Sequence, residues 1–170
     1  MVTGAGKGIG LGVTRKLVSL GAHVYAVSRT ESDLIKLKTE LGDKITPITL
    51  DIANWQLVDQ TLGAIKDVTG LVNNAAVASC APFLDATESQ FDTQFNVNVK
   101  AMMHISQIVA KSMVEQKRGG SIVNISSQAS QAALTDHVIY GMTKAAVDQM
   151  TRVMALELGP HKVKKIQKKS

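Results

Sequence analysis

The sequence predicts an α/β fold in which a doubly wound parallel sheet carries helices on both faces. Short runs of β-branched and apolar residues alternate along the chain with helical segments of about ten residues or more. Such alternation is typical of βαβ units, whose right-handed crossovers place helices on either side of one sheet. The length of 170 residues and the hydrophobic fraction of 45% suit a single domain with its own core.

The individual elements follow from apolar periodicity and from the residues that interrupt it. Apolar residues recur at helical spacing in the longer segments, and β-rich runs stand between them. Gly119-Gly120 and Gly159-Pro160 end the two longest helices. The expected strands are residues 2–3, 23–28, 45–50, 70–73 and 121–126, and the expected helices are residues 8–20, 31–41, 54–66, 88–116 and 138–158.

A glycine-rich loop follows the first expected strand and opens the first expected helix. Gly4 would allow the tight turn, and Gly8 and Gly10 would allow close approach of phosphates and close packing of the helix. The free N–H groups and the positive dipole at the start of that helix suit a pyrophosphate. We therefore expect a Rossmann-type dinucleotide site that includes Gly4, Gly6, Lys7, Gly8, Ile9 and Gly10.

The residues after the second expected strand select the cofactor. This segment reads Ser28-Arg29-Thr30 and carries no acid at the strand end. An acid there would bind the ribose 2′-hydroxyl of NAD, whereas an arginine accommodates the 2′-phosphate of NADP. Lys7 adds a second cation, so the predicted cofactor is NADP(H). The alternative is that Arg29 is only a surface charge beside a helix.

Two more segments at strand ends are candidates for cofactor contact. Asp51 would accept from the adenine amino group or cap the following helix, and both interpretations remain open at this point. The run Asn73-Asn74-Ala75-Ala76 ends the fourth expected strand, where small residues would let a cofactor lie across the sheet edge. We include Asn74 and Ala75 in the predicted cofactor site.

A serine, a tyrosine and a lysine form the predicted catalytic set. Tyr140 and Lys144 are four residues apart on one expected helix and therefore share a face. A free tyrosine, with a pKa of about 10, is a weak acid at neutral pH, and a nearby lysine cation lowers that pKa. Ser127 ends the fifth expected strand and can hydrogen-bond a carbonyl oxygen, with Ser126 as the neighbouring alternative. Asn98 would hold a water that continues a proton relay from Lys144.

On these motifs the chain resembles the short-chain dehydrogenase/reductase family. The matching runs are TGAGKGIG, NNAA, FNVNVK and YGMTK, and Ala75-Ala76 departs from the usual alanine-glycine. The resemblance implies NADPH-dependent reduction of L-xylulose, related sugars and α-dicarbonyls such as diacetyl. It makes Tyr140 the acid and Lys144 its activator and ribose anchor.

The resemblance also implies roles around the substrate. Ser127 would position the carbonyl group, and Asn98 would support the proton relay. Gln128 and His137 fall at substrate-side positions, although His137 as an ordinary loop residue remains an open alternative. We expect no metal ion at this site.

The chain departs from the family pattern at both ends. Its first strand is clipped, and residues 161–170 carry five lysines and no acid where the family continues with further strands. We therefore expect a partial domain over residues 1–160 that lacks its sixth and seventh strands, followed by a disordered basic tail over residues 161–170. This pattern suggests a truncated or alternatively encoded product.

Charge and composition narrow the possible partners. The net charge of +5 lies entirely in the last ten residues, since the rest of the chain holds 14 basic and 14 acidic residues. No aromatic residue interleaves with those lysines, so we expect no nucleic-acid partner. The single cysteine, Cys80, and the lack of a secretory pattern suggest the cytoplasm, with peripheral membrane association left open.

The two longest helices suggest self-association. In the family, the helices expected at 88–116 and 138–158 pair subunits, and the seventh strand serves the second interface of a homotetramer. We therefore expect a homo-oligomer formed through these helices if the chain folds. The alternative function is a non-catalytic isoform that binds the cofactor or pairs with full-length subunits.

Overall fold

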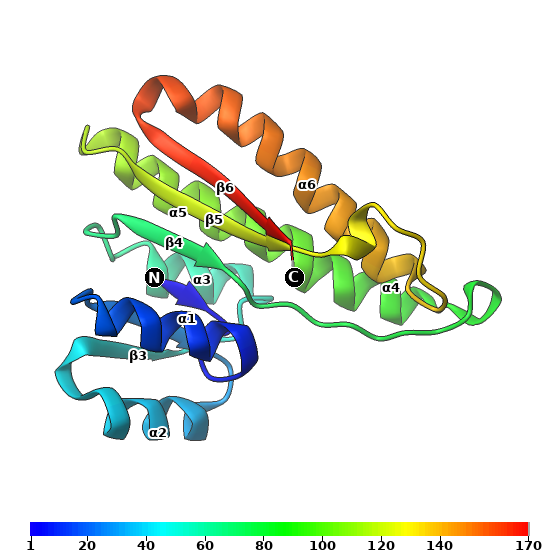
Figure 1. Cartoon of the computed structure of the whole chain (residues 1–170), viewed down its shortest axis with the longest axis horizontal. Coiled ribbons are helices and arrows are strands. Elements are labelled where there is room, and N and C mark those ends of the chain that lie inside the picture. Colours follow the sequence, from blue (N-terminus) through cyan, green and yellow to red (C-terminus); the bar gives the residue numbers. More distant parts are fainter. Residues whose placement is uncertain (170) are drawn as a thin grey trace.

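The computed structural model describes residues 1–169, with side chains described through residue 164. Six parallel strands form one sheet in the order β3-β2-β1-β4-β5-β6 (Figure 1). The predicted doubly wound α/β fold is confirmed. The strands are β1 (Val2–Thr3), β2 (Val24–Ser28), β3 (Ile45–Thr49), β4 (Gly70–Asn73), β5 (Gly120–Ser126) and β6 (Val163–Lys169).

Helices cover both faces of the sheet, because side chains alternate across each strand. In β2, Ala26 packs with α1 and α2 on one face, whereas Val27 packs with α3 and α5 on the other. The C-terminal part of α6 joins the second cluster through Met154 and Leu158. The helices are α1 (Gly8–Ser19), α2 (Glu31–Leu41), α3 (Trp55–Leu62), α4 (Glu88–Phe95), α5 (Met102–Glu115) and α6 (Val138–Leu158).

Two predicted helices differ from the structure. The helix expected at 54–66 ends at Leu62 and is followed by Gly63, a residue that weakens helices. The helix expected at 88–116 is interrupted by a π-helical segment, η3 (Asn96–Ala101), which separates α4 from α5. A π-helical turn is wider than an α-helical one and often marks a functional site. Short 3₁₀ turns lie at η1 (Gly42–Lys44), η2 (Phe83–Asp85), η4 (Gln128–Ser130) and η5 (Gly159–His161).

The lysine-rich segment contradicts two predictions. Residues 163–169 form β6, which pairs in parallel with β5 from Gly120↔Val163 to Ser126↔Lys169. The prediction that a sixth strand is missing and the prediction that the tail is disordered are therefore wrong. Strand pairing uses backbone groups, and an edge strand tolerates charged side chains that a central strand would not. Val163 is buried and anchors the strand in the apolar cluster beneath the sheet.

The first strand has the two residues that the sequence predicted. Val2 pairs with Ala26 of β2 and with Val72 of β4, and Val72 N donates to Met1 O at 2.9 Å. This short strand is nevertheless the centre of the sheet. Residues 1–169 include no strand beyond β6.

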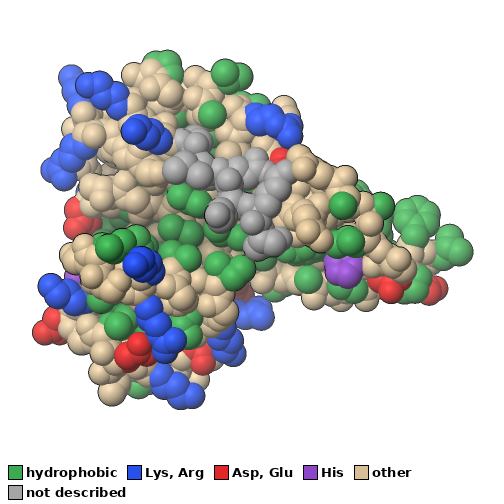
Figure 2. Space-filling view, in the orientation of Figure 1, with side chains coloured by type: hydrophobic (Ala, Val, Ile, Leu, Met, Phe, Trp, Pro, Cys, Tyr) green, Lys and Arg blue, Asp and Glu red, His purple; other side chains and the backbone are tan. Residues whose placement is uncertain are grey.

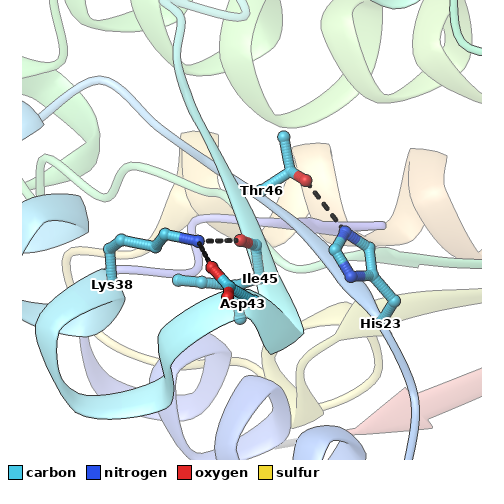
Figure 3. A network of polar contacts seen from close by, with 5 residues as sticks. All are labelled: His23, Lys38, Asp43, Ile45 and Thr46. Atoms are coloured by element: carbon cyan, nitrogen blue, oxygen red, sulfur yellow. Dashed lines mark hydrogen bonds and ion pairs between the residues drawn. The ribbon is translucent and has the colours of Figure 1, made fainter.

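Polar contacts hold the start of β3 at the far edge of the sheet. Lys38 Nζ donates to Asp43 Oδ1 at 3.2 Å and to Ile45 O at 3.1 Å (Figure 3). On the other side of the strand, His23 Nε2 lies 2.8 Å from Thr46 Oγ1. The Lys38 contacts join α2 to the start of β3, and the His23 contact joins β3 to the segment before β2.

The molecule narrows toward one end, where loops project beyond the sheet beside the start of α6 (Figure 1). Apolar side chains gather on this narrow end (Figure 2). Phe83 and Leu84 are 75% and 91% exposed. None of the helices among residues 1–169 is long and apolar enough to cross a bilayer.

Candidate functional site

A cavity of about 410 Å³ opens beside the carboxyl ends of the central strands. Here β1 lies between β2 and β4. Strands β2 and β3 follow on one side of β1, and strands β4 to β6 follow on the other side, so the strand order reverses at this point. Ligands of open parallel sheets bind at such a switch point. Thirteen of the predicted residues line the cavity: Gly4, Gly6, Lys7, Gly8, Ile9, Ser28, Arg29, Thr30, Asp51, Asn74, Ala75, Tyr140 and Lys144.

The glycine loop is shaped by two close approaches. Gly4 has a φ of +65°, and a Cβ there would lie 2.8 Å from Asn74 Nδ2. At Gly10 a Cβ would lie 2.1 Å from Gly4 O, so only glycine lets α1 pack against the loop. Gly10 is buried behind the loop and does not line the cavity. Its role in this structure is therefore helix packing.

Asn74 ties the ends of β1 and β4 together. Its Nδ2 donates to Thr3 O at 3.0 Å and to Gly4 O at 3.2 Å. In return, Thr3 Oγ1 accepts from the backbone N–H groups of Asn74 at 3.0 Å and Ala75 at 3.1 Å. This exchange fixes the start of the glycine loop against the segment that follows β4.

The segment after β2 forms another part of the cavity wall. Ser28 Oγ accepts from Thr30 N at 3.2 Å and closes a short turn before α2. Arg29 is exposed within this turn. Lys7, whose side chain is 74% exposed, reaches across from the glycine loop to within 3.3 Å of Asp33 Oδ2. Two cations and one carboxylate therefore line this part of the cavity.

The alternative role for Asp51 as a helix cap is wrong. The N-cap of α3 is Asn54, whose side chain accepts from Leu57 N at 3.1 Å. Asp51 Oδ1 instead accepts from Ala53 N at 3.0 Å, and Asp51 stands on the cavity wall. Contact between Asp51 and an adenine remains a proposal.

Asp33 is a cavity residue that is absent from the predicted site residues. This residue lies in the first turn of α2, lines the cavity and packs beside Gly6. The prediction of cofactor preference used only the residues at the strand end. The detectable signal was an acidic residue one helical turn beyond Arg29, on a helix that begins beside the expected cofactor site.

Tyr140 and Lys144 come from one face of α6 and reach the cavity together. Lys144 is 1% exposed, and its Nζ donates to Ile125 O at 2.8 Å. The same nitrogen lies 5.5 Å from the centre of the Tyr140 ring. Burial lowers the pKa of Lys144 from 10.5 to about 8, and the Asp148 carboxylate acts in the opposite direction. The Lys144 amine thus lies beside the phenol ring of Tyr140 at the cavity wall.

The two serines at the end of β5 have different surroundings. Ser126 is fully buried, where its Oγ donates to Asp148 Oδ1 and lies 3.5 Å from Lys144 O. Ser127 caps η4, and its Oγ accepts from Ala129 N at 3.3 Å. Ser127 is 8% exposed and does not line the 410 Å³ cavity. The structure therefore does not bring Ser127 into the cavity wall with Tyr140.

Asn98 lies on the π-helical segment and is completely buried. Its Oδ1 accepts from Val77 N at 2.8 Å, and its Nδ2 donates to Val77 O at 2.8 Å and to Thr143 Oγ1 at 3.2 Å. These bonds link the segment after β4 to α6, one residue before Lys144. The side chain therefore positions the two walls of the cavity, and a relay water remains a proposal.

The other predicted substrate residues lie outside the 410 Å³ cavity. Gln128 is exposed. His137 lines a separate cavity of about 550 Å³, and its ring stands edge-on to that of Tyr140, with 6.3 Å between the ring centres. Its Nδ1 lies 2.6 Å from Thr135 O, and its Nε2 lies 3.4 Å from Cys80 Sγ.

Residues 1–169 contain no group of three or more His, Cys, Asp or Glu side chains arranged to hold a metal ion. Beside the carboxylates of Asp33 and Asp51, the cavity presents backbone, hydroxyl and cationic groups. These are groups that suit a phosphate-containing organic ligand.

Comparison with known proteins identifies similar chains. L-xylulose reductase of Mesocricetus auratus is 50% identical over 164 residues, which are 96% of this chain and 67% of that protein. Carbonyl reductase [NADPH] 2 of Sus scrofa is 46% identical over 164 residues, which are likewise 96% of this chain and 67% of that protein. The chain thus spans about two thirds of the length of these relatives.

A solved structure shows the same fold. The short-chain dehydrogenase from Burkholderia cenocepacia J2315 in complex with NADP is 30% identical, with a TM-score of 0.87 over 98% of this chain and 68% of that one. The family model described as short chain dehydrogenase matches residues 1–167. Together with the glycine loop and the Tyr140–Lys144 pair on one cavity, these matches place the chain in the short-chain dehydrogenase family.

Proposed function

We propose that this chain binds NADP(H) and reduces small carbonyl compounds, namely ketose sugars such as L-xylulose and α-dicarbonyls such as diacetyl. One observation carries the proposal. A single cavity combines the glycine loop, the Ser28–Thr30 segment and the Tyr140–Lys144 pair, which lie far apart in the sequence. The names of the relatives support the choice of substrates and of NADPH.

The cavity residues fit a dinucleotide phosphate. Gly8 begins α1, where the first N–H groups of the helix have no partner within the helix and can receive a pyrophosphate. Lys7 and Arg29 offer cationic groups to a 2′-phosphate. Asp51 would accept from the adenine, and Asn74 and Ala75 form the wall between β1 and β4. When bound, the nicotinamide supplies the hydride.

The proton comes from the chain itself. Tyr140 donates its hydroxyl proton to the carbonyl oxygen while the carbon is reduced. The Lys144 cation stabilises the phenolate that remains, because an opposite charge nearby favours the ionised form. Ser127 donates a hydrogen bond to the same oxygen. Gln128 and His137 contact the far side of the substrate, and Asn98 keeps the segment after β4 aligned with α6.

Turnover with a matched tyrosine control tests this proposal. The chain contains two tyrosines, and Tyr25 is bonded to Asp67 on the outer part of the sheet, away from the cavity. Oxidation of NADPH with diacetyl or L-xylulose should fall about 100-fold or more in Tyr140→Phe, the usual size of a lost general acid. Tyr25→Phe should keep its activity. Equal rates in Tyr140→Phe and the unmodified chain would reject the proposal.

A second candidate is a cofactor-binding subunit that pairs without catalysis. A groove of about 720 Å³ runs between α5 and α6. Met103 and Val153 line it at 39% and 41% exposure, and Leu156 is 79% exposed nearby. This apolar surface favours a homo-oligomer formed through these helices. The absence of Ser127 from the cavity wall favours a subunit without catalysis. Sedimentation together with the turnover assay separates the candidates, since a dimer without turnover supports the second.

We retain a cytoplasmic location as a proposal.

A further inference from the structure

Asp33 introduces a negative charge into the cationic part of the cavity. The residue lines the wall together with Ser28, Arg29 and Thr30. Its side chain is 15% exposed, and its Oδ2 is buried without a hydrogen-bond donor among the described residues. Lys7 Nζ lies 3.3 Å from this oxygen but does not meet hydrogen-bond geometry. A buried acceptor oxygen without a donor is costly, and a ligand hydroxyl can supply that donor only after Lys7 moves off the oxygen.

The glycine loop holds this carboxylate in place. A Cβ at Gly6 would lie 2.8 Å from Asp33 Cβ and 3.4 Å from Asp33 Oδ2. The same position lies 3.3 Å from Ser28 Oγ. The loop, the strand end and the first turn of α2 are therefore in close contact around Asp33. The carboxylate is a largely buried group at the place where the adenosine half of the cofactor would lie.

Lys7 and Asp33 are held differently. The Lys7 side chain is 74% exposed and the Asp33 side chain 15% exposed. An ion pair with one highly exposed partner contributes little stability, so Lys7 can leave Asp33 for a phosphate. Asp33 cannot move away in the same manner. A 2′-phosphate would therefore be attracted by Lys7 and Arg29 and repelled by the Asp33 carboxylate. Asp33 also attracts Lys7 and so competes with the phosphate for it.

We infer that Asp33 determines cofactor specificity by favouring the unphosphorylated adenosine ribose over the 2′-phosphorylated one. Its Oδ2 accepts a hydrogen bond from a ribose hydroxyl. Against a 2′-phosphate it acts by charge repulsion and by competing for Lys7. Asp33 thus opposes Lys7 and Arg29 and lets the chain retain NADH alongside NADPH. The inference rests on the proposed dinucleotide-binding function.

Dissociation constants for NADPH and NADH test this role in the whole chain. Asp33→Asn should bind NADPH about threefold to tenfold more tightly, the effect of one charge–charge interaction in a solvent-accessible site. NADH should bind equally or more weakly. The gain should shrink in about 0.5 M salt, because salt screens charges. Glu31→Gln is the matched control, since it removes the same charge from the same helical turn at an exposed position that does not line the cavity.

The outcomes separate this inference from the proposed function. If the ratio of the NADH to the NADPH dissociation constant rises in Asp33→Asn and stays constant in Glu31→Gln, the inference holds. If the unmodified chain binds NADPH but the ratio rises less than twofold or falls, the inference alone is overturned. If the unmodified chain binds neither dinucleotide, the proposed function and the inference both fail. Asp33→Ser serves as a second variant if the asparagine form does not fold.

Discussion

Replacing Lys144 with methionine should stabilise the chain near neutral pH while removing a group that we propose to be catalytic. The structure buries this amine almost completely, and its pKa falls from 10.5 to about 8. That fall corresponds to about 3 kcal/mol of destabilisation at any pH where the amine is protonated in both the folded and the unfolded chain. Methionine has a similar length without the charge. It leaves Ile125 O without its donor, which costs about 1 kcal/mol. We therefore expect a net gain of about 2 kcal/mol at pH 7.

The pH dependence distinguishes this explanation from simple repacking. Between pH 8 and 10.5 the unfolded chain holds a proton on Lys144 that the folded chain has released. Raising the pH through this window therefore stabilises the unmodified chain, and the advantage of Lys144→Met should disappear by about pH 10.5. Other titrating groups are common to both proteins and largely cancel in the difference.

Chemical denaturation of both proteins at several pH values between 7 and 10.5 measures this difference directly. The reasoning is refuted if Lys144→Met is less stable than the unmodified chain at pH 7. It is equally refuted if the difference between the two proteins does not change with pH.

Three further predictions concern the rate, the loop and the cofactor. Turnover should fall above about pH 8, because the Lys144 cation is lost there, and a rate that stays flat to pH 10 would contradict its role. Gly10→Ala should cost about 2–3 kcal/mol in thermal or chemical unfolding, because its Cβ would lie 2.1 Å from Gly4 O. Gly12→Ala is its control, since a Cβ there meets nothing within 4 Å, and equal losses in both would rule out the packing explanation. Arg29→Asp should weaken NADPH binding about tenfold more than NADH binding, whereas equal weakening would argue against a phosphate contact.

Local patterns predicted the parts of the fold whose residues carry their own signals. β1, β4, α2 and α6 have the predicted bounds, because glycine, proline and apolar periodicity mark their ends. The pair Tyr140 and Lys144 lies on one helix face for the same reason. Thirteen predicted cofactor residues share one cavity because parallel strands bring their carboxyl ends together.

The remaining features depend on contacts between distant segments. β6 was missed because its lysines suggest a solvated tail, whereas its pairing with β5 is made by the backbone. The π-helical turn at Asn98 reflects contacts with Val77 and Thr143, which no local pattern shows. Asp33 reaches the cavity only because α2 folds back against Gly6. The spacing from Ser127 to Tyr140 likewise does not reveal that Ser127 lies off the cavity wall.

The most direct test of a dinucleotide site is a thermal melt of the purified chain with and without NADPH. At a cofactor concentration of about 100 times its dissociation constant, binding adds about 2.7 kcal/mol and should raise the Tm by about 5–10 °C. NADH at the same concentration should raise the Tm less. A cooperative transition that neither cofactor moves would contradict the central claim that this cavity binds NADP(H).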